Sequence, residues 1–272
     1  MIISETHGVS FVHVPKCGGM TIKDQFVEIH DHPLNFETFA DHPVLGWVRP
    51  AHLPLWALRD HYPDVIESLS QTCSFALCRD PHDRFESALA QYFRKMRKVR
   101  INELPRREVL AVARDVVAHI AATPALSEGT YCHFIRQTDF VTLDGDRLVE
   151  RVFPLARIDA LAAEMAALTG RSDAGAATLR SNQTLDFRLR GSEGWLRRAS
   201  GVAKRLLPIG AHARLKAGVK ALFVRGGSRH AGFSRQETDL DDFIRDYYAE
   251  DAVLFADATA RGVSDRPQAA RA

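Results

Sequence analysis

The chain lacks any long apolar run: none of its 272 residues lies in a stretch approaching the ~20 apolar residues of a membrane-spanning helix. Its first residues, MIISETHGVS, contain no basic region followed by an apolar core, so we expect no secretory leader. The four cysteines form no C-x-x-C pair and show no metal-ligand spacing, which indicates reduced thiols. These absences together predict a cytoplasmic protein.

Internal repeats are also absent, and the length suits one large domain with an ample core. Apolar runs of strand length alternate with segments of helical periodicity, which is typical of an α/β fold. We expect strands near 9–14, 74–78 and 150–155. The predicted helices lie near 20–29, 54–70, 82–98, 105–122, 158–169 and 236–257.

The most informative segment is VSFVHVPKCGGMTI, residues 9–22. An apolar β-branched run breaks at Pro15, and a glycine pair then precedes helix-compatible sequence. Gly18 and Gly19 allow the backbone to approach a ligand closely, and the first amides of a helix have no internal partner. With the charge of Lys16, this turn predicts a site for phosphate or sulfate. The same residues could also form an ordinary glycine turn that binds no ligand.

A second segment, SFALCRDPHDRFESALAQY (residues 74–92), repeats the same pattern. The strand ends at Arg79, and Asp80 is a natural N-cap for a helix that begins at Pro81. Ser87 follows two turns into that helix. Because ligands bind at the carboxyl edge of open parallel sheets, we expect both junctions to lie side by side there.

The two motifs PKCGGMT and CRDPHDRFESALAQY resemble the cofactor motifs of sulfotransferases that use 3′-phosphoadenosine 5′-phosphosulfate (PAPS), in particular the carbohydrate branch with the heparan and chondroitin enzymes. In that family the first motif reads roughly P-K-T-G-G/A-T-S/T and the second R-D-P-x-x-R-x-x-S. The shared residues are Pro15, Lys16, Gly18, Gly19, Thr21, Arg79, Asp80, Pro81, Arg84 and Ser87. Weaker similarity extends over residues 8–257, including Arg157 and Leu161, with Asp159 where the family usually has Glu.

The resemblance implies a three-layer sandwich with a central parallel sheet, the P-loop-like sulfotransferase fold, in one domain over residues 1–257. Residues 258–272 would form a disordered tail. The co-substrate would be PAPS without a metal, and the acceptor a carbohydrate or glycolipid hydroxyl. The implied cofactor-binding residues are Lys16, Cys17, Gly18, Gly19, Met20, Thr21, Arg79 and Ser87.

Two positions depart from the family pattern. Cys17 replaces a usual Thr, and Met20 replaces a usual Ser or Thr, which removes two hydroxyl donors. Backbone amides would still bind the phosphate. At an electropositive helix start, Cys17 could be a reactive thiolate, but we favour a small residue that only replaces Thr.

Sulfuryl transfer, like phosphoryl transfer, is an in-line displacement in which charge builds on the leaving phosphate oxygen. Lys16 is the candidate catalytic cation at that oxygen. His52, in RPAHLPLWAL between the motifs, is the candidate catalytic base because histidine titrates near neutral pH, although it could equally be a surface loop residue. Other candidate bases are Glu5, Asp80 and Glu86, with Asp80 better explained as a cap. We expect His13 to be buried within the first strand, and His30 and His32 to lack a third metal ligand.

The net charge of +2 conceals a basic segment, because residues 188–230 contain eleven Lys or Arg and one acid, Glu193. This insertion or subdomain could contact an anionic glycan, the nucleotide or a membrane surface, or be a solvated insertion. Nucleic acid is a less suitable partner because aromatic residues are not interleaved with the charges. A second basic cluster, RKMRKVR (residues 94–100), could line an acceptor groove or be a solvated helix end.

Two other functions share these features. A P-loop kinase would use a similar sheet, but G-x-x-x-x-G-K-[ST] is absent and Lys16 precedes the glycines. A non-catalytic anion-binding or glycan-binding protein would keep the cofactor contacts and lack a base. Dependence on ATP would favour the kinase, and binding without turnover would favour the binding protein.

Overall fold

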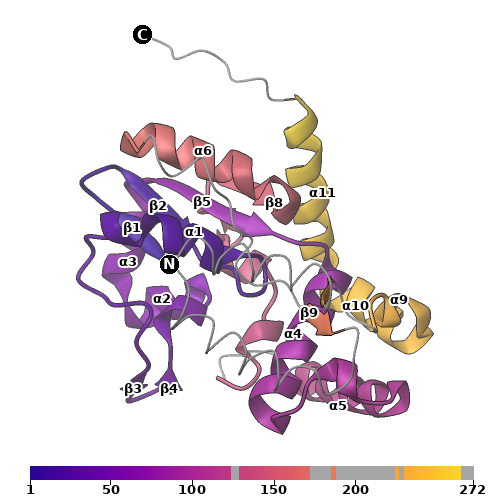
Figure 1. Cartoon of the computed structure of the whole chain (residues 1–272). Coiled ribbons are helices and arrows are strands. Elements are labelled where there is room, and N and C mark those ends of the chain that lie inside the picture. The colour runs from indigo at the N-terminus through magenta and orange to yellow at the C-terminus, as the bar shows by residue number, and fades with distance from the viewer. Residues whose placement is uncertain (124–128, 172–184, 188–223, 227–229, 265–272) are drawn as a thin grey trace, which may run out of the picture.

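A computed structural model describes residues 1–123, 129–171, 185–187, 224–226 and 230–264 (Figure 1). Its central sheet has the strand order β1-β2-β5-β8, formed by β1 (Ile2–Ser4), β2 (Val9–Val12), β5 (Cys73–Cys78) and β8 (Arg151–Pro154). β5 runs parallel to both of its neighbours, with Val12 opposite Ala76 and Cys78 opposite Pro154. All three strands that the sequence predicts are therefore present, and the mixed α/β class is confirmed.

The sheet is mostly rather than wholly parallel, which corrects the prediction at one edge. β1 is antiparallel to β2, with Ile3 opposite Ser10. A tight turn joins the two strands, in which Gly8 has a φ of +62° and its N–H donates to the Glu5 carbonyl at 3.2 Å. A three-residue strand is too short to show the alternation by which strands are recognised, so the sequence pattern missed it.

Helices lie on both sides of this sheet (Figure 1). α6 (Ile158–Thr169) packs against β2 and β8 along one side, and α2 (Leu55–His61) and α3 (Pro63–Ser70) lie on the other, with α3 against β5. α11 (Ala249–Ser264) contacts β8 and β5. The core is apolar, and Phe11 and Phe75 on neighbouring strands are fully buried in it.

Two predicted helices are interrupted. The expected helix at 54–70 divides at Tyr62 because Pro63 cannot donate to the preceding turn, and it becomes the first residue of α3. The expected helix at 236–257 divides into α10 (Thr238–Tyr247) and α11, and α11 is helical up to Ser264, beyond the predicted domain end at residue 257.

The helices that begin at the predicted junctions are α1 (Gly19–Phe26) and α4 (Pro81–Tyr92), and α4 continues into the π-helix η3 (Phe93–Arg97). The other helical elements are η1 (Val27–Ile29), η2 (Pro50–His52), η4 (Ile101–Glu103), α5 (Arg106–Ala122), η5 (Cys132–Phe134), η6 (Thr138–Phe140), η7 (Leu155–Arg157) and α9 (Phe233–Gln236). The remaining strands form the pairs β3 (Ala40–His42) with β4 (Gly46–Val48), β6 (Thr142–Leu143) with β7 (Asp146–Arg147), and β9 (Leu185–Phe187) with β10 (Val224–Gly226). Among the described helices, none combines the length and apolar character that a bilayer crossing requires.

Candidate functional site

The first predicted junction, between β2 and α1, has an unusual backbone. Lys16 has a φ of +69° and Gly18 a φ of +85°, so the loop contains two left-handed residues, one of them not glycine. Such strain in a non-glycine residue is concentrated at functional sites in proteins. No side chain caps the start of α1, where Gly18 is the N-cap residue. Among the described residues, the N–H groups of Gly19 and Met20 at the start of α1 have no hydrogen-bond partner, so they can bind water or a ligand.

Both glycines of this loop are required by their neighbours. A Cβ on Gly18 would lie 2.5 Å from Cδ1 of Leu155, and a Cβ on Gly19 would lie 2.9 Å from Nδ1 of His13. His13 is buried, as the sequence predicts, with 6 % of its surface exposed. The glycine pair thus lets α1 begin directly against the sheet and against η7.

The second junction, between β5 and α4, has the predicted cap. The side chain of Asp80 accepts a hydrogen bond from the Asp83 N–H at 3.1 Å and also pairs with Arg235. Because the Asp80 carboxylate already has these partners, the structure supports its role as a helix cap and not as a catalytic base. Since β2 and β5 are adjacent and parallel, the loops that follow them lie at the same edge of the sheet.

Gln137, which is fully buried, connects the two junctions. Its Oε1 accepts from the Arg79 N–H at 2.8 Å and from the Cys17 thiol at 3.1 Å, while its Nε2 donates to the Arg79 carbonyl at 2.8 Å. One side chain therefore fixes the backbone of the second loop and contacts the first. This role could not be predicted, because a single glutamine outside both motifs has no recognisable sequence pattern.

Arg84 forms a second connection between the loops. Its buried guanidinium donates to the carbonyls of Pro15 at 3.1 Å and Ile135 at 2.5 Å, and it lies 3.9 Å from the Asp251 carboxylate. Asp251 in turn accepts from the backbone N–H groups of Gln137 at 2.8 Å and Thr138 at 2.9 Å. The second arginine of the motif is therefore a structural residue that holds the first loop.

Cationic side chains gather where the loops meet. Burial first, and then the charges of Arg94, Arg79 and Lys95, together lower the pKa of Lys16 to about 8, against an opposite effect of Cys17. Within the described part of the chain, none of these four cations pairs with a carboxylate. A group of cations without counter-charges is costly unless an anion binds, so this edge of the sheet has the electrostatics of an anion site.

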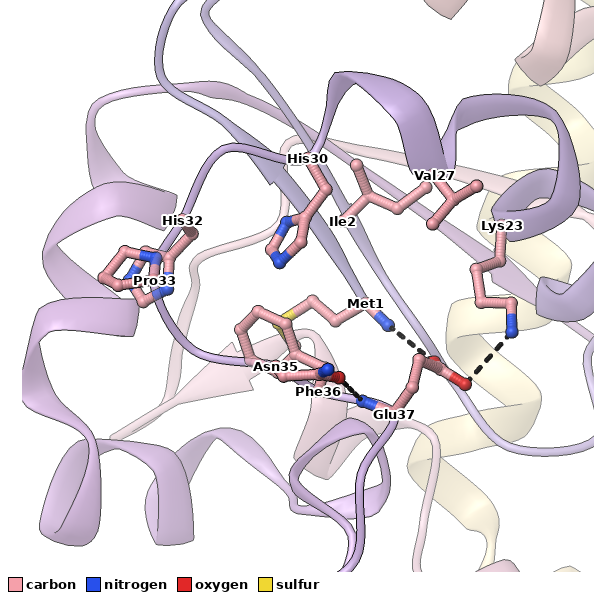
Figure 2. A pocket seen from close by; sticks show the side chains of 10 residues that line it. All are labelled: Met1, Ile2, Lys23, Val27, His30, His32, Pro33, Asn35, Phe36 and Glu37. Carbon is pink, nitrogen blue, oxygen red and sulfur yellow. Dashed lines mark hydrogen bonds and ion pairs between the residues drawn. The ribbon is translucent and has the colours of Figure 1, made fainter.

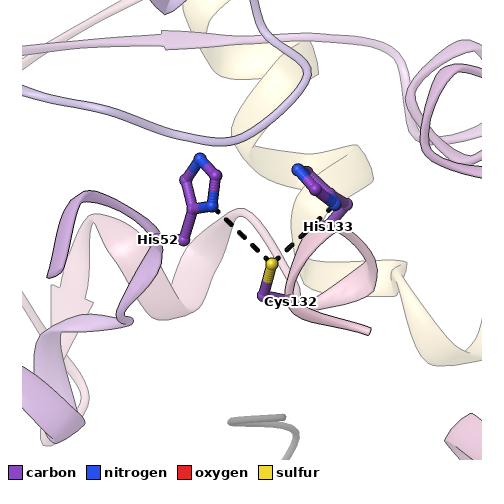
Figure 3. A group of neighbouring side chains, drawn as sticks. All are labelled: His52, Cys132 and His133. Atoms are coloured by element: carbon purple, nitrogen blue, oxygen red, sulfur yellow. Dashed lines mark hydrogen bonds between the residues drawn. The ribbon is translucent and has the colours of Figure 1, made fainter. Parts of the chain in front are cut away.

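His52 lies beside this group, together with two residues that the sequence analysis did not select. Nδ1 of His52 is 3.7 Å from the sulfur of Cys132, and Nδ1 of His133 is 3.8 Å from the same sulfur (Figure 3). The His52 and His133 ring centroids are 5.1 Å apart, and the His13 ring is 5.8 Å from that of His52. Cys132 and His133 are consecutive residues without a recognisable motif, which explains why they were missed.

These histidines are held neutral. Burial first, and then the charges of Arg49, Lys95, the N-terminal amine and Lys16, together lower the pKa of His52 to about 3. Burial lowers the pKa of His133 to about 2, helped by His52, Lys16 and Lys95. His52 is 9 % exposed, so it is not the surface loop residue that the sequence left open. Both rings therefore respond to the charge of Lys16.

The remaining predicted residues differ in their surroundings. Cys17 is fully buried, and burial raises the pKa of its thiol to about 12, so it is not a reactive thiolate. Thr21 is buried with its N–H donating to the Gly18 carbonyl at 3.0 Å, and Met20 is half-buried in the first turn of α1. Ser87 is half-buried one turn after Arg84, and its hydroxyl has no hydrogen-bond partner among the described residues.

Two alternative bases are occupied elsewhere. Glu86 accepts hydrogen bonds from the N–H groups of Gly232 at 2.9 Å and Ser234 at 3.1 Å, at the start of α9. Glu5 accepts from the Ser68 hydroxyl at 2.6 Å. Neither carboxylate is therefore placed to take a proton near Lys16.

A pocket of about 280 Å³ lies away from these loops, beside β1 and α1 (Figure 2). It includes His30 and His32, but His30 bonds to the backbone of Ile3 and His32 lies 3.5 Å from Asp64. Lys23 in its wall pairs with Glu37 at 3.1 Å, so its charge is neutralised. The pocket contains none of the predicted site residues.

The basic segment at 188–230 lies almost entirely outside the described residues, and so does its predicted contact with glycan, nucleotide or membrane. The basic cluster at 94–100 is described, and its first four residues belong to the π-helix that follows α4. Comparisons of the chain with protein-family models, with curated proteins and with solved structures find no match.

Proposed function

We propose that this protein is a PAPS-dependent sulfotransferase that transfers the sulfuryl group to a hydroxyl of a carbohydrate or glycolipid acceptor. The single observation that carries the proposal is a set of cations, Lys16 and Arg79 with Arg94 and Lys95, which pair with no carboxylate among the described residues and gather where two strand-to-helix junctions meet at one sheet edge. PAPS carries anionic groups at two separated positions. Two adjacent cationic junctions match that distribution of charge better than one phosphate loop would.

In this proposal the first loop holds the phosphosulfate and the second loop holds the 3′-phosphate through Arg79 and Ser87. The amides at the start of α1 and the Lys16 ammonium stabilise negative charge on the phosphosulfate. Gln137 and Arg84 are positioning residues, because they fix the backbone of Arg79 and of Pro15. The fold that this implies is the P-loop-like sulfotransferase fold.

The transfer forms a bond from the acceptor oxygen to sulfur and breaks the bond from sulfur to the phosphate oxygen, which leaves as part of adenosine 3′,5′-bisphosphate. Lys16 neutralises the charge that develops on that oxygen. His52 accepts the hydroxyl proton of the acceptor. Burial is the main reason why the pKa of His52 lies near 3, and the nearby charges contribute less. A bound anion beside Lys16 and Lys95 offsets the contribution of those charges and so makes His52 a stronger base.

A carbohydrate acceptor is supported by exposed aromatic rings near the cations. Phe39 and Trp47 stack with centroids 5.9 Å apart and are 41 % and 65 % exposed, and Nζ of Lys95 lies 6.0 Å from the Phe39 ring. Exposed aromatic surface at the edge of a site commonly marks a binding face. The apolar face of a sugar ring would stack on these rings, while Lys95 would meet an anionic substituent.

The first test is calorimetric titration with adenosine 3′,5′-bisphosphate and, separately, with ATP. We expect the bisphosphate to bind more tightly, and Lys16→Ala and Arg79→Ala each to weaken it at least about tenfold, the size of one lost charge-assisted hydrogen bond. Arg245→Ala removes an exposed cation on α10 and should change nothing. No binding of the bisphosphate, or preference for ATP, would contradict the proposal.

The second test measures turnover with PAPS and a panel of carbohydrate acceptors. His52→Ala should lower kcat while leaving bisphosphate affinity near the wild-type value, and Trp47→Ala should raise KM for the acceptor. A chemical step of unchanged rate in His52→Ala would assign the base elsewhere. Binding of the bisphosphate with no turnover on any acceptor would leave an anion-binding protein instead of an enzyme.

A further inference from the structure

His52, Cys132 and His133 form a compact group of metal-binding side chains. One donor atom from each of the three side chains lies within 4.8 Å of the other two. His52 ends η2 and the other two begin η5, so elements far apart in the sequence bring the group together. In Figure 3 both rings turn toward the same sulfur atom. All three residues are buried, with exposed fractions of 9 %, 5 % and 7 % in the order of the chain.

The hydrogen bonds of the three side chains indicate which of their atoms carry protons. The Cys132 thiol lies 3.3 Å from the Gly129 carbonyl, which can only accept, so the thiol proton is directed there. With the thiol proton directed there, we assign Nδ1–H of His52 and of His133 as the donors to the sulfur, at 3.7 and 3.8 Å. This arrangement leaves the Nε2 atom of each neutral ring without a proton.

The distances match those between ligands of one tetrahedral ion. With Zn–S near 2.3 Å and Zn–N near 2.0–2.1 Å, tetrahedral angles place sulfur and nitrogen ligands about 3.6 Å apart. The observed separations of 3.7 and 3.8 Å differ from that value only slightly. One thiolate and two neutral imidazoles are donors that Zn²⁺ prefers, and three protein ligands leave a fourth position for water or an anion.

The surroundings both favour and oppose a cation. Burial keeps both imidazoles in the neutral form that binds metals. Burial raises the pKa of the Cys132 thiol to about 11, against a smaller opposite effect of the charges of Lys95 and Arg49, so a metal ion must displace a tightly held proton. The same two charges also repel a bound cation directly. We therefore expect binding weaker than in a structural zinc site, and strengthened by an anion at the fourth position.

We propose that His52, Cys132 and His133 form a binding site for a thiophilic divalent transition metal ion, with Zn²⁺ as the best match to the donor set. On binding, the thiol releases its proton to solvent, and each ring moves its proton from Nδ1 to Nε2. One proton is thus released per ion. If the proposed transferase function holds, an occupied site carries Nε2–H on His52, which can no longer accept the acceptor proton, so Zn²⁺ inhibits transfer.

The test titrates the full, metal-free chain with Co²⁺ as a spectroscopic probe and then displaces it with Zn²⁺. We expect one equivalent to give a thiolate-to-cobalt charge-transfer band with tetrahedral d–d bands, and Zn²⁺ to abolish both. Cys132→Ser and His133→Ala should each weaken Zn²⁺ binding at least about 100-fold. Cys73→Ser, which alters a half-buried thiol at the start of β5, should leave the titration unchanged.

Folding of each variant is checked by circular dichroism, and proton release from the wild-type chain gives a measurement that needs no variant. Release of one proton per Zn²⁺ bound at constant pH supports the site. Absence of the thiolate band, or its persistence in Cys132→Ser, overturns it. None of these measurements depends on PAPS or on turnover, so this proposal fails or stands separately from the proposed function.

Discussion

Gln137 and Arg79 form a reciprocal pair in which the glutamine Oε1 accepts from the arginine N–H and its Nε2 donates to the arginine carbonyl, both at 2.8 Å. The side-chain amide thus bonds to the residue that directly follows β5 in the way a neighbouring strand would. Because Oε1 also accepts from Cys17, the pair fixes the distance between the two cationic junctions. The geometry of the candidate site therefore depends on a residue outside both motifs.

Gln137→Ala should destabilise the protein and weaken bisphosphate binding together. It leaves the Arg79 N–H and carbonyl without their partner at a half-buried position, and each unsatisfied group costs at most about 1–3 kcal/mol. Urea denaturation measures the free energy of unfolding, and calorimetry measures the affinity. Gln71→Ala, which removes an exposed glutamine beside Glu67, is the control and should change neither. Unchanged affinity in a folded Gln137→Ala protein would show that the loops hold their spacing without it.

Gly18→Ala should destabilise the fold more than Gly8→Ala. Both glycines have a positive φ, which costs a side chain about 1 kcal/mol, but only at Gly18 would the new Cβ meet Leu155, at 2.5 Å. The difference in unfolding free energy between the variants measures the clash. In a Leu155→Ala background that difference should shrink, because the clashing atom is gone while the backbone strain persists. Equal effects of the two substitutions would contradict the predicted close approach.

Bisphosphate affinity should fall as the pH rises above about 8, where Lys16 loses its proton in the empty site. The bound anion favours the ammonium form, so binding takes up a proton in this range, and affinity falls by at most about tenfold per pH unit. Calorimetry between pH 6 and 10 in buffers of different ionisation enthalpy measures both the affinity and the proton uptake. In Lys16→Ala this part of the pH dependence should disappear, and its persistence would assign it to another group.

The lowered pKa of Lys16 also makes the stability of the unliganded protein rise with pH, whereas it makes the bisphosphate affinity fall. Lys16 titrates near 8 in the folded chain and near the model-compound value of 10.5 when unfolded, so the unfolded chain binds more protons between those values. The free energy of unfolding should therefore gain a contribution from Lys16 as the pH rises through this window. Comparing wild type with Lys16→Met by urea denaturation at pH 7 and pH 9 isolates that contribution.

Arg84→Ala should destabilise the protein by about 3–5 kcal/mol, the cost of leaving a buried carboxylate without its charge partner. Arg84→Lys should recover little, because one ammonium cannot reach both the Pro15 and Ile135 carbonyls as the guanidinium does. Thermal unfolding compares these variants with Arg84→Ala combined with Asp251→Asn. The double variant should lose less than the sum of the single variants, whereas strict additivity would show that the two residues do not interact.

Much of the fold could be predicted because its signals are local. Apolar runs that end at Pro15 and Arg79 locate two parallel strands, and Asp80 with Pro81 gives the start of α4 correctly. The sequence pattern also singled out Lys16 and Arg79 as candidate cations, and the structure places them close enough for the charge of Arg79 to lower the pKa of Lys16. The missed elements are those without a local pattern, such as the short edge strand β1 and the break at Tyr62 between α2 and α3.

The sequence by itself therefore determined the α/β class and the two junctions with their charges, because strand length, turn residues and helix caps act over a few neighbouring positions. Only the tertiary structure decided which distant side chains complete the site. Gln137, Asp251, Cys132 and His133 reach the junctions through packing of elements far apart in the chain. Tertiary packing also buries Cys17 and so makes its thiol unreactive, because burial disfavours the thiolate whatever the local sequence.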